Sequence, residues 1–159
     1  MRVLSIDAPG GREGGYVLWT PDRLIDSAPI RFDPKHSEAE DYRVLARLLD
    51  QTTPTLVILE KPYLWRIAQY IGGLQMAAAL KQIPWYMLSA SVAKKTVLGK
   101  GNASKAEVYA WAASYHLFRD YVERPNGWKP TQHEADSLAY LVAWRRLEDE
   151  VIPAILHLR

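Results

Sequence analysis

The chain of 159 residues contains no cysteine. Disulfide frameworks, zinc sites built on thiolates and cysteine nucleophiles are therefore excluded. Long apolar runs are missing too, because nothing approaches the roughly 18 consecutive apolar residues of a membrane-spanning helix. The N-terminus, MRVLSIDAPG, lacks the basic start and apolar stretch of a secretory signal. We therefore expect a cytoplasmic protein without membrane attachment.

The sequence also lacks low-complexity segments, internal repeats and linkers. Hydrophobic residues make up 48% and charged residues 24%, with 10 prolines and 9 glycines spread along the chain, so disordered and collagen-like classes are excluded. The length suits one domain with a real core but not two. We predict that residues 1–159 form a single domain.

Acidic residues are scarce in the middle of the chain. The net charge of +2 divides into −3 over residues 1–60, +7 over residues 61–129 and −2 over residues 130–159. No carboxylate occurs between Glu60 and Glu107, whereas lysine and arginine recur throughout this interval. A basic segment of this kind predicts contact with a polyanion.

The apolar patterns predict an α/β fold. Five short apolar runs read as strands: the first three form an antiparallel meander, and the last two are typical of buried parallel strands. Pro29 places the third strand at a sheet edge. Segments with apolar residues at helical spacing predict helices on both faces of this mixed five-stranded sheet. The predicted strands are 2–7, 16–19, 24–32, 55–60 and 84–88, and the predicted helices are 37–52, 64–82, 104–117 and 131–146.

Two of the predicted strands end in a carboxylate. Asp7 closes the first strand, just before the predicted turn APGGREGG, and Glu60 closes the fourth. Taken singly, each is more readily interpreted as a solvated acid at a strand end. If the two strands are neighbours, however, the side chains meet in a crevice at the carboxyl end of the sheet, where α/β proteins bind ligands.

A third acid and an imidazole begin the last predicted helix. In QHEADSLAYL, His133 and Asp136 are three residues apart and share a face, while Leu138 and Leu141 bury the helix against the sheet. The alternative interpretation is that Asp136 and Glu134 only complement the helix dipole and that His133 is exposed.

Together these side chains offer three carboxylates and one imidazole. Such a donor set favours Mg²⁺ or Mn²⁺ over zinc. Two ions of this kind a few ångströms apart activate water and stabilise the leaving oxygen in phosphodiester hydrolysis. The basic segment then has an evident role, which is to hold the phosphate backbone.

Four segments carry a family resemblance. They are VLSIDAPGG, LVILEKPY, VAKKTVLGKGNASKAEV and HEADSLAYLVA. In this order they resemble the aspartate strand and turn, the glutamate strand, the basic segment and the acidic helix of the RuvC-type Holliday-junction resolvases, which belong to the RNase H-like nuclease superfamily. The turn reads DAPGG where the family usually has DPG. The resemblance spans most of the chain and implies an RNase H-like fold.

The same resemblance assigns the catalytic residues. Asp7, Glu60 and Asp136 take the positions of catalytic carboxylates, and His133 takes a position that is aspartate in some members and histidine in others. The four are expected to bind Mg²⁺, with Mn²⁺ as a substitute. Glu134 is not a ligand, since its place beside His133 turns it about 100° away around the helix.

The resemblance also implies DNA contacts. Tyr63 takes the place of an aromatic that contacts unpaired bases at the crossover, although an ordinary half-buried tyrosine is the alternative. Lys94 and Lys105 correspond to lysines that hold DNA, and Lys95 and Lys100 extend the patch. A solvated basic face is the alternative, ranked lower because glycines let the backbone approach closely and no acid neutralises the segment.

The implied function is a homodimeric, Mg²⁺-dependent endonuclease that resolves four-way DNA junctions by paired symmetric nicks and leaves 5′-phosphates. Branch-migration machinery is a candidate partner, and helix 64–82 is a candidate dimer interface, although packing on the sheet explains its small residues equally well. Compact members are familiar from phages and prophages, which leaves flaps, other branched DNA and RNA open as substrates. A catalytically silent junction binder is a further alternative, against which the intact set of four ligands speaks.

Overall fold

Five strands form the centre of the molecule in a computed structural model, which describes residues 1–121 and 129–156. They are β1 (Val3–Asp7), β2 (Glu13–Trp19), β3 (Leu24–Arg31), β4 (Leu56–Glu60) and β5 (Trp85–Leu88). Their order in the sheet is β3-β2-β1-β4-β5. The first three pair antiparallel, and β4 and β5 run parallel to β1. The predicted mixed sheet is confirmed, with Pro29 on an edge strand.

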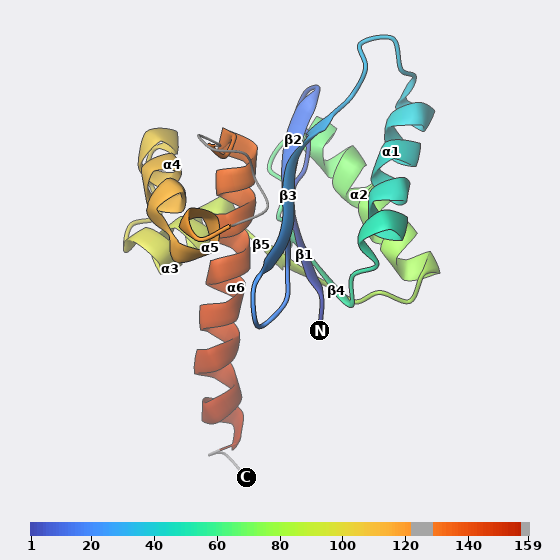
Figure 1. The fold of residues 1–159 in the computed structure, drawn as a ribbon. Helices are drawn as coiled ribbons and strands as arrows, with labels where there is room; N and C mark the ends of the chain where they lie inside the picture. The colour runs from blue at the N-terminus through green and yellow to red at the C-terminus, as the bar shows by residue number, and fades with distance from the viewer. Residues whose placement is uncertain (122–128, 157–159) are drawn as a thin grey trace.

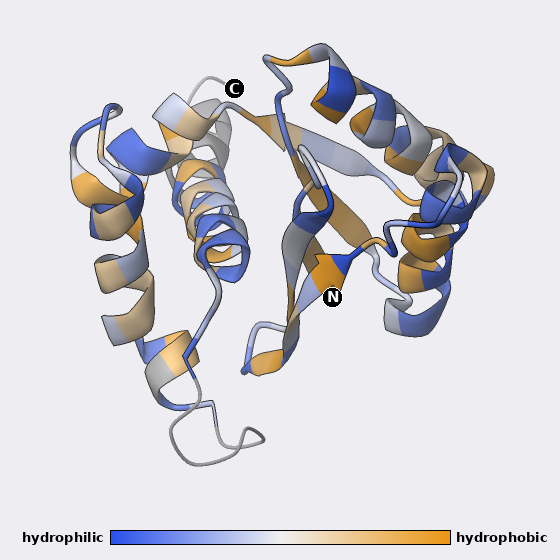
Figure 2. Ribbon diagram, turned by 90° about the horizontal axis from the view of Figure 1, so that it is seen from above, coloured by the Kyte–Doolittle hydropathy of each residue, from blue (hydrophilic) through white to orange (hydrophobic). Residues whose placement is uncertain are grey.

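Helices cover both faces of this sheet (Figure 1). One face carries α1 (Glu38–Thr52) and α2 (Trp65–Leu80). The other carries α3 (Ala90–Leu98), α4 (Lys105–Ser114), α5 (His116–Arg119) and α6 (Gln132–Leu156). Seen from above, hydrophobic residues run along the central strands between the two helical layers (Figure 2). No helix in the described ranges is long and apolar enough to cross a membrane.

The alternation of side chains along the strands divides the core into two layers. Val3 and Ile58 pack in the cluster that includes α4 and α6, whereas Leu4 packs in the cluster that includes α1 and α2. Successive side chains of a strand point to opposite faces. Asp7 and Glu60 therefore follow Val3 and Ile58 to the face that α6 covers.

The predicted starts of two helices are confirmed by their caps. Ser37 begins α1 and Ser104 begins α4, each in a capping box with the glutamate three residues on. The predicted ends of two others differ. The helix expected to reach residue 117 breaks at Tyr115 into α4 and α5, and α6 continues well beyond residue 146.

The sequence prediction missed α3. This nine-residue helix begins after Ser89, whose side chain accepts the Val92 N–H, and ends at Gly99, whose φ of 79° is left-handed. Ala93 and Val97, four residues apart, form its buried face. A helix this short is not stable alone, so its packing against α6 decides its formation.

Candidate active site

Asp7 and Glu60 end neighbouring parallel strands. In the pairing of β1 with β4, Ile6 lies opposite Leu59, so the two acids occupy the next position on each strand. Asp7 is 8% exposed and Glu60 is 6% exposed. The structure therefore brings both carboxylates together at the carboxyl end of the sheet, as the strand pattern predicts.

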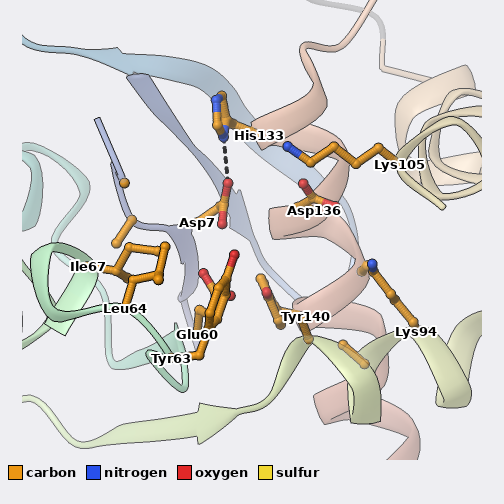
Figure 3. Close-up of a pocket in the computed structure, with 15 residues that line it drawn as sticks. Asp7, Glu60, Tyr63, Leu64, Ile67, Lys94, Lys105, His133, Asp136 and Tyr140 are labelled. Atoms are coloured by element: carbon orange, nitrogen blue, oxygen red, sulfur yellow. Dashed lines mark hydrogen bonds and ion pairs between the residues drawn. The ribbon is translucent and has the colours of Figure 1, made fainter. Parts of the chain in front are cut away.

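The first turns of α6 add the other two predicted residues. His133 Nδ1 lies 2.6 Å from Asp7 Oδ2, and the side chain of Asp136 faces the same cleft (Figure 3). The hydrogen bond and the charge of Asp7 raise the pKa of His133 above its ordinary value. The alternative of an exposed histidine in the cap region is therefore wrong.

These side chains line a cleft of about 240 Å³ (Figure 3). Strands β1 and β4 and helix α6 supply its acids, while α3 and α4 supply two lysines on the side of α6, across from Asp7 and Glu60. The start of α2 forms its remaining wall. The polar lining residues are Asp7, Glu60, Tyr63, Lys94, Lys105, His133, Asp136 and Tyr140.

Negative charge is crowded in this cleft. Burial, together with the charge of Asp7, raises the pKa of Glu60 to about 7. Burial and the same charge raise the pKa of Asp136 to about 6. Each ionised carboxylate therefore disfavours ionisation of its neighbours, and a bound cation relieves this repulsion.

Tyr140 is a residue of the cleft that the sequence prediction did not identify. Its hydroxyl hydrogen-bonds the carboxylate of Glu60, which favours the ionised form of that acid. Burial and the charge of Glu60 raise the pKa of Tyr140 itself, so the phenol stays protonated and remains a donor. The sequence could have identified Tyr140 from its position four residues after Asp136, which puts both residues on the same face of the helix.

The approach of α6 to the sheet depends on Gly15. A Cβ at this position would lie 2.6 Å from the backbone carbon of His133 and 2.7 Å from the amide nitrogen of Glu134. The prediction that Gly14 and Gly15 belong to a turn is wrong, because both lie in β2. Glycine is required here for close backbone approach in a strand.

Glu134 lies outside the acidic cluster, as predicted. Its Oε1 accepts the hydroxyl of Ser27 on β3 at 2.7 Å, and its Oε2 accepts the Thr131 N–H at 2.9 Å. The Thr131 hydroxyl accepts the Glu134 N–H in return. This capping box satisfies backbone N–H groups at the start of α6 and so sets where the helix begins.

The four predicted lysines differ in their surroundings. Lys94 and Lys105 line the cleft, whereas Lys95 is exposed on α3. Lys100 pairs with Glu107, whose pKa its hydrogen bond lowers to about 2. The expectation that no acid neutralises this segment is therefore wrong for Lys100.

Tyr63 stands at the rim of the cleft with 74% of its surface exposed. The interpretation of a half-buried tyrosine is therefore wrong. Leu64 and Trp65 beside it are also exposed. An exposed ring is free to stack on a base, which is worth about 1–3 kcal/mol per base.

The donor set of the cleft suits a divalent cation. Among the residues that the structure describes, no group of three or more histidine, aspartate and glutamate side chains is arranged to hold a metal ion. Two candidate ligand atoms, Asp7 Oδ2 and His133 Nδ1, instead contact each other. Carboxylates whose pKa is raised by burial and by mutual repulsion nevertheless match the hard oxygen ligands that Mg²⁺ and Mn²⁺ prefer.

Comparison with solved structures shows the fold. The Thermus thermophilus RuvC in complex with a Holliday junction substrate matches over 90% of this chain and 91% of its own, with a TM-score of 0.65 and 19% identity. The fowlpox virus Holliday junction resolvase matches over 92% of this chain and 98% of its own, with a TM-score of 0.65 and 17% identity. The predicted RNase H-like fold is thereby confirmed.

Sequence comparison shows the family. No family model matches the chain. The crossover junction endodeoxyribonuclease RuvC of Chlamydia abortus is 34% identical over 122 residues, which cover 67% of this chain and 73% of the relative. The RuvC of Chlamydia caviae is likewise 34% identical over 122 residues, covering 67% of this chain and 72% of the relative. The chain therefore belongs to the RuvC family of crossover junction endodeoxyribonucleases, enzymes that hydrolyse DNA.

Proposed function

We propose that this protein resolves four-way (Holliday) DNA junctions by paired symmetric nicks that leave 5′-phosphates. The observation that carries the proposal is the convergence of Asp7, Glu60, His133 and Asp136 in one cleft of a RuvC-family chain. The structural neighbour from Thermus thermophilus is bound to a Holliday junction as its substrate. We assign these four residues as the catalytic group.

RuvC-type nucleases are metal-dependent, and we propose Mg²⁺ as the ion here, with Mn²⁺ as a substitute. The carboxylates of Asp7, Glu60 and Asp136 and the imidazole of His133 would hold it. A divalent cation supplies activation of water and stabilisation of the leaving oxygen. Binding of the ion requires these carboxylates in ionised form, and the Tyr140 hydroxyl favours that form of Glu60 by donating to it.

The surroundings of the cleft suit a branched, negatively charged substrate. Lys94 and Lys105 line the cleft together with the acids, and we expect them to hold phosphates next to the scissile bond. Lys95 and Lys100 flank them on the same segment. Tyr63 at the rim offers an exposed ring to unpaired bases at the crossover. Phosphate contacts position the DNA, while the aromatic ring favours unstacked bases over a regular duplex.

We further propose a homodimer, because two symmetric cuts require two sites. Residues of helix α2 that are exposed in the monomer support this. Gly73 is explained by packing within the monomer, since a Cβ there would lie 2.6 Å from the ring of Tyr42 on α1. Packing within the monomer does not account for Gly72, Met76 and Leu80, which are exposed. We propose that these three residues contact the partner subunit.

The oligomeric state tests the dimer. Leu80→Lys places a charge on the exposed side of α2, and we expect sedimentation to show a monomer where the wild type is a dimer. Leu80→Met keeps the side chain apolar and is the matched control. A monomeric wild type, or a dimeric Leu80→Lys variant, would contradict this interface.

Cleavage of a labelled mobile four-way junction beside a matched linear duplex tests the function. We expect paired symmetric nicks on the junction alone, only with Mg²⁺ or Mn²⁺, and none in EDTA. Asp7→Asn should lower the rate at least about 100-fold while junction binding persists, because only the charge of one carboxylate changes. Asp149→Asn, an exposed acid on α6, should cut normally.

Other outcomes identify the alternatives. Equal cutting of flaps, single strands or RNA would keep the metal-dependent nuclease but change its substrate. Tight junction binding without cutting would favour the silent binder. Retained cleavage by Asp7→Asn would overturn the assignment of the catalytic group.

A further inference from the structure

Ser137 occupies a buried position directly behind the acidic cleft. It follows Asp136 on α6 and is 0% exposed. Its hydroxyl accepts the backbone N–H of Asp7 at 2.9 Å. The same oxygen lies 2.9 Å from the carbonyl oxygens of Gly15 and His133, so its proton is donated to one of them.

A second hydroxyl completes this contact. The side chain of Ser5 on β1 donates to the carbonyl oxygen of Ser137 at 2.7 Å, and Ser5 is also fully buried. One residue of α6 therefore bonds the strand that carries Asp7 in two places and reaches β2 through Gly15. An alanine would fill nearly the same space but would leave the Asp7 N–H buried without this partner.

The contact lies between the two halves of the proposed catalytic group. Asp7 belongs to β1, whereas His133 and Asp136 belong to α6. The two elements are far apart along the chain, so only contacts in the folded state set their relative position. Asp7 Oδ2 lies 2.6 Å from His133 Nδ1, so a small shift of either element changes that distance. Groups of this kind must be held within about 0.5 Å of their working geometry.

We propose that Ser137 is a positioning residue, whose hydroxyl sets the carboxylate of Asp7 relative to His133 and Asp136 and so prepares the cation site. The inference rests on the proposed function of that site. Groups that orient metal ligands typically change metal affinity or activity 10- to 100-fold when they are removed. Ser137 acts on Asp7 through its backbone, without touching the substrate.

Ser27 provides a matched control. It is also fully buried, and its hydroxyl also bonds α6, at Glu134 Oε1. That bond ties the helix to β3 and does not reach Asp7. Ser27→Ala and Ser137→Ala therefore each remove one buried hydroxyl that joins α6 to the sheet, but only Ser137→Ala removes the partner of the Asp7 N–H.

The experiment compares these two variants with the wild type in four measurements. They are thermal unfolding, calorimetric binding of Mn²⁺ without DNA, junction binding in EDTA, and junction cleavage at saturating junction. We expect both variants to lose similar stability and to bind the junction as the wild type does. Only Ser137→Ala should weaken Mn²⁺ binding about 10-fold and lower kcat about 10- to 100-fold, with KM unchanged.

Equal Mn²⁺ binding and equal kcat in the two variants would overturn the inference and leave Ser137 with a structural role only. If Ser137→Ala does not fold, Ser5→Ala tests the same contact, because it removes the bond to the Ser137 carbonyl and leaves the hydroxyl in place. It should weaken Mn²⁺ binding more than Ser27→Ala does, and equality would again overturn the inference. A wild type that neither binds Mn²⁺ nor cuts junctions would instead refute the proposed function, and the inference with it.

Discussion

Single side chains set the charge of the cleft. Burial and the charge of Asp7 both favour the neutral forms of Glu60 and Asp136. The hydrogen bond from His133 to Asp7, by contrast, raises the pKa of His133 and so favours its charged form. Tyr140 opposes the neutral form of one acid, because its hydroxyl donates to Glu60. The active state of the cleft therefore depends on which groups release their protons before the cation binds.

Tyr140→Phe tests this balance. Without the phenolic donor, the pKa of Glu60 should rise above its value of about 7, since the ionised form loses a hydrogen bond. We expect junction cleavage near neutral pH to fall about 10-fold and to recover as the pH is raised. The pH dependence of the cleavage rate measures this shift.

Tyr70→Phe is the control for that experiment. Tyr70 is also buried and also donates to a carboxylate, that of Asp41, but in the core layer formed by α1 and α2. Its loss should lower stability without moving the pH profile of cleavage. Identical pH profiles for Tyr140→Phe and the wild type would contradict the role given to the Tyr140 hydroxyl.

The lysines of the basic segment should differ in their effect on DNA binding. Lys94→Ala and Lys105→Ala each remove a charge that faces the cleft, so each should reduce the slope of log K against log salt by about 0.9 for every phosphate that the variant no longer neutralises. Lys100→Ala should have a smaller effect, because Glu107 already neutralises that charge. Fluorescence anisotropy with a junction at several salt concentrations measures the slopes, and a larger change for Lys100→Ala would contradict this order.

At the scale of elements, the fit of α6 against β2 decides whether the site forms. Gly15→Ala would place a Cβ within 2.7 Å of the backbone at the start of α6, and backbone cannot rotate away as a flexible side chain can. We expect a loss of about 1–3 kcal/mol in the free energy of unfolding and a loss of cleavage in the fraction that stays folded. Urea unfolding and junction cleavage measure the two effects.

Gly11→Ala is the control for this substitution. It lies in the loop between β1 and β2, and a Cβ there has no neighbour within 4 Å. It should change the free energy of unfolding by less than about 0.5 kcal/mol, as surface substitutions usually do. Equal stability of the two variants would show that α6 can move away from β2.

The same elements show what the sequence alone predicts. A terminal carboxylate on each of two apolar strands indicated that Asp7 and Glu60 meet if those strands are neighbours, and helical spacing indicated that His133 shares a face with Asp136. Contacts between distant segments were not visible in these local patterns. Gly15 was predicted to lie in a turn although it belongs to strand β2. The reason for a glycine there is the close approach of α6, which leaves no space for a Cβ and which the local sequence does not show. Helix α3 was missed for the same reason, since its stability comes from packing against α6.

At the scale of the whole molecule, the two helical layers have different tasks. The layer of α3, α4 and α6 faces the acids and supplies both the cleft lysines and half of the proposed catalytic group. The layer of α1 and α2 supports the sheet from behind, and the start of α2 brings Tyr63 to the rim of the cleft. The sheet thus separates a surface for DNA chemistry from the surface of α2 that we propose as the dimer interface.

The crowded acids also link the stability of the whole molecule to pH and to the cation. Glu60 and Asp136 have a raised pKa in the folded state, so between about pH 4 and 7 the folded chain binds more protons than the unfolded chain. Their contribution to stability is therefore lost as the pH rises through this window. The raised pKa of His133 acts in the same direction, because its stabilising charge is also lost as the pH rises.

We therefore expect the melting temperature in EDTA to fall between about pH 5 and 8. A divalent cation binds the ionised groups of the folded state only. Mg²⁺ should therefore raise the melting temperature at pH 8 and change it little at pH 5, where protons occupy the same site. At about 100 times its Kd, the ion should add about 2.7 kcal/mol. Glu60→Gln removes one of the two carboxylates with a raised pKa, so it should flatten the fall in EDTA and weaken the response to Mg²⁺. A wild-type melting temperature that rises steadily over this range in EDTA, or a Mg²⁺ response that is the same at both pH values, would show that the acids of this cleft are not coupled in the way their burial implies.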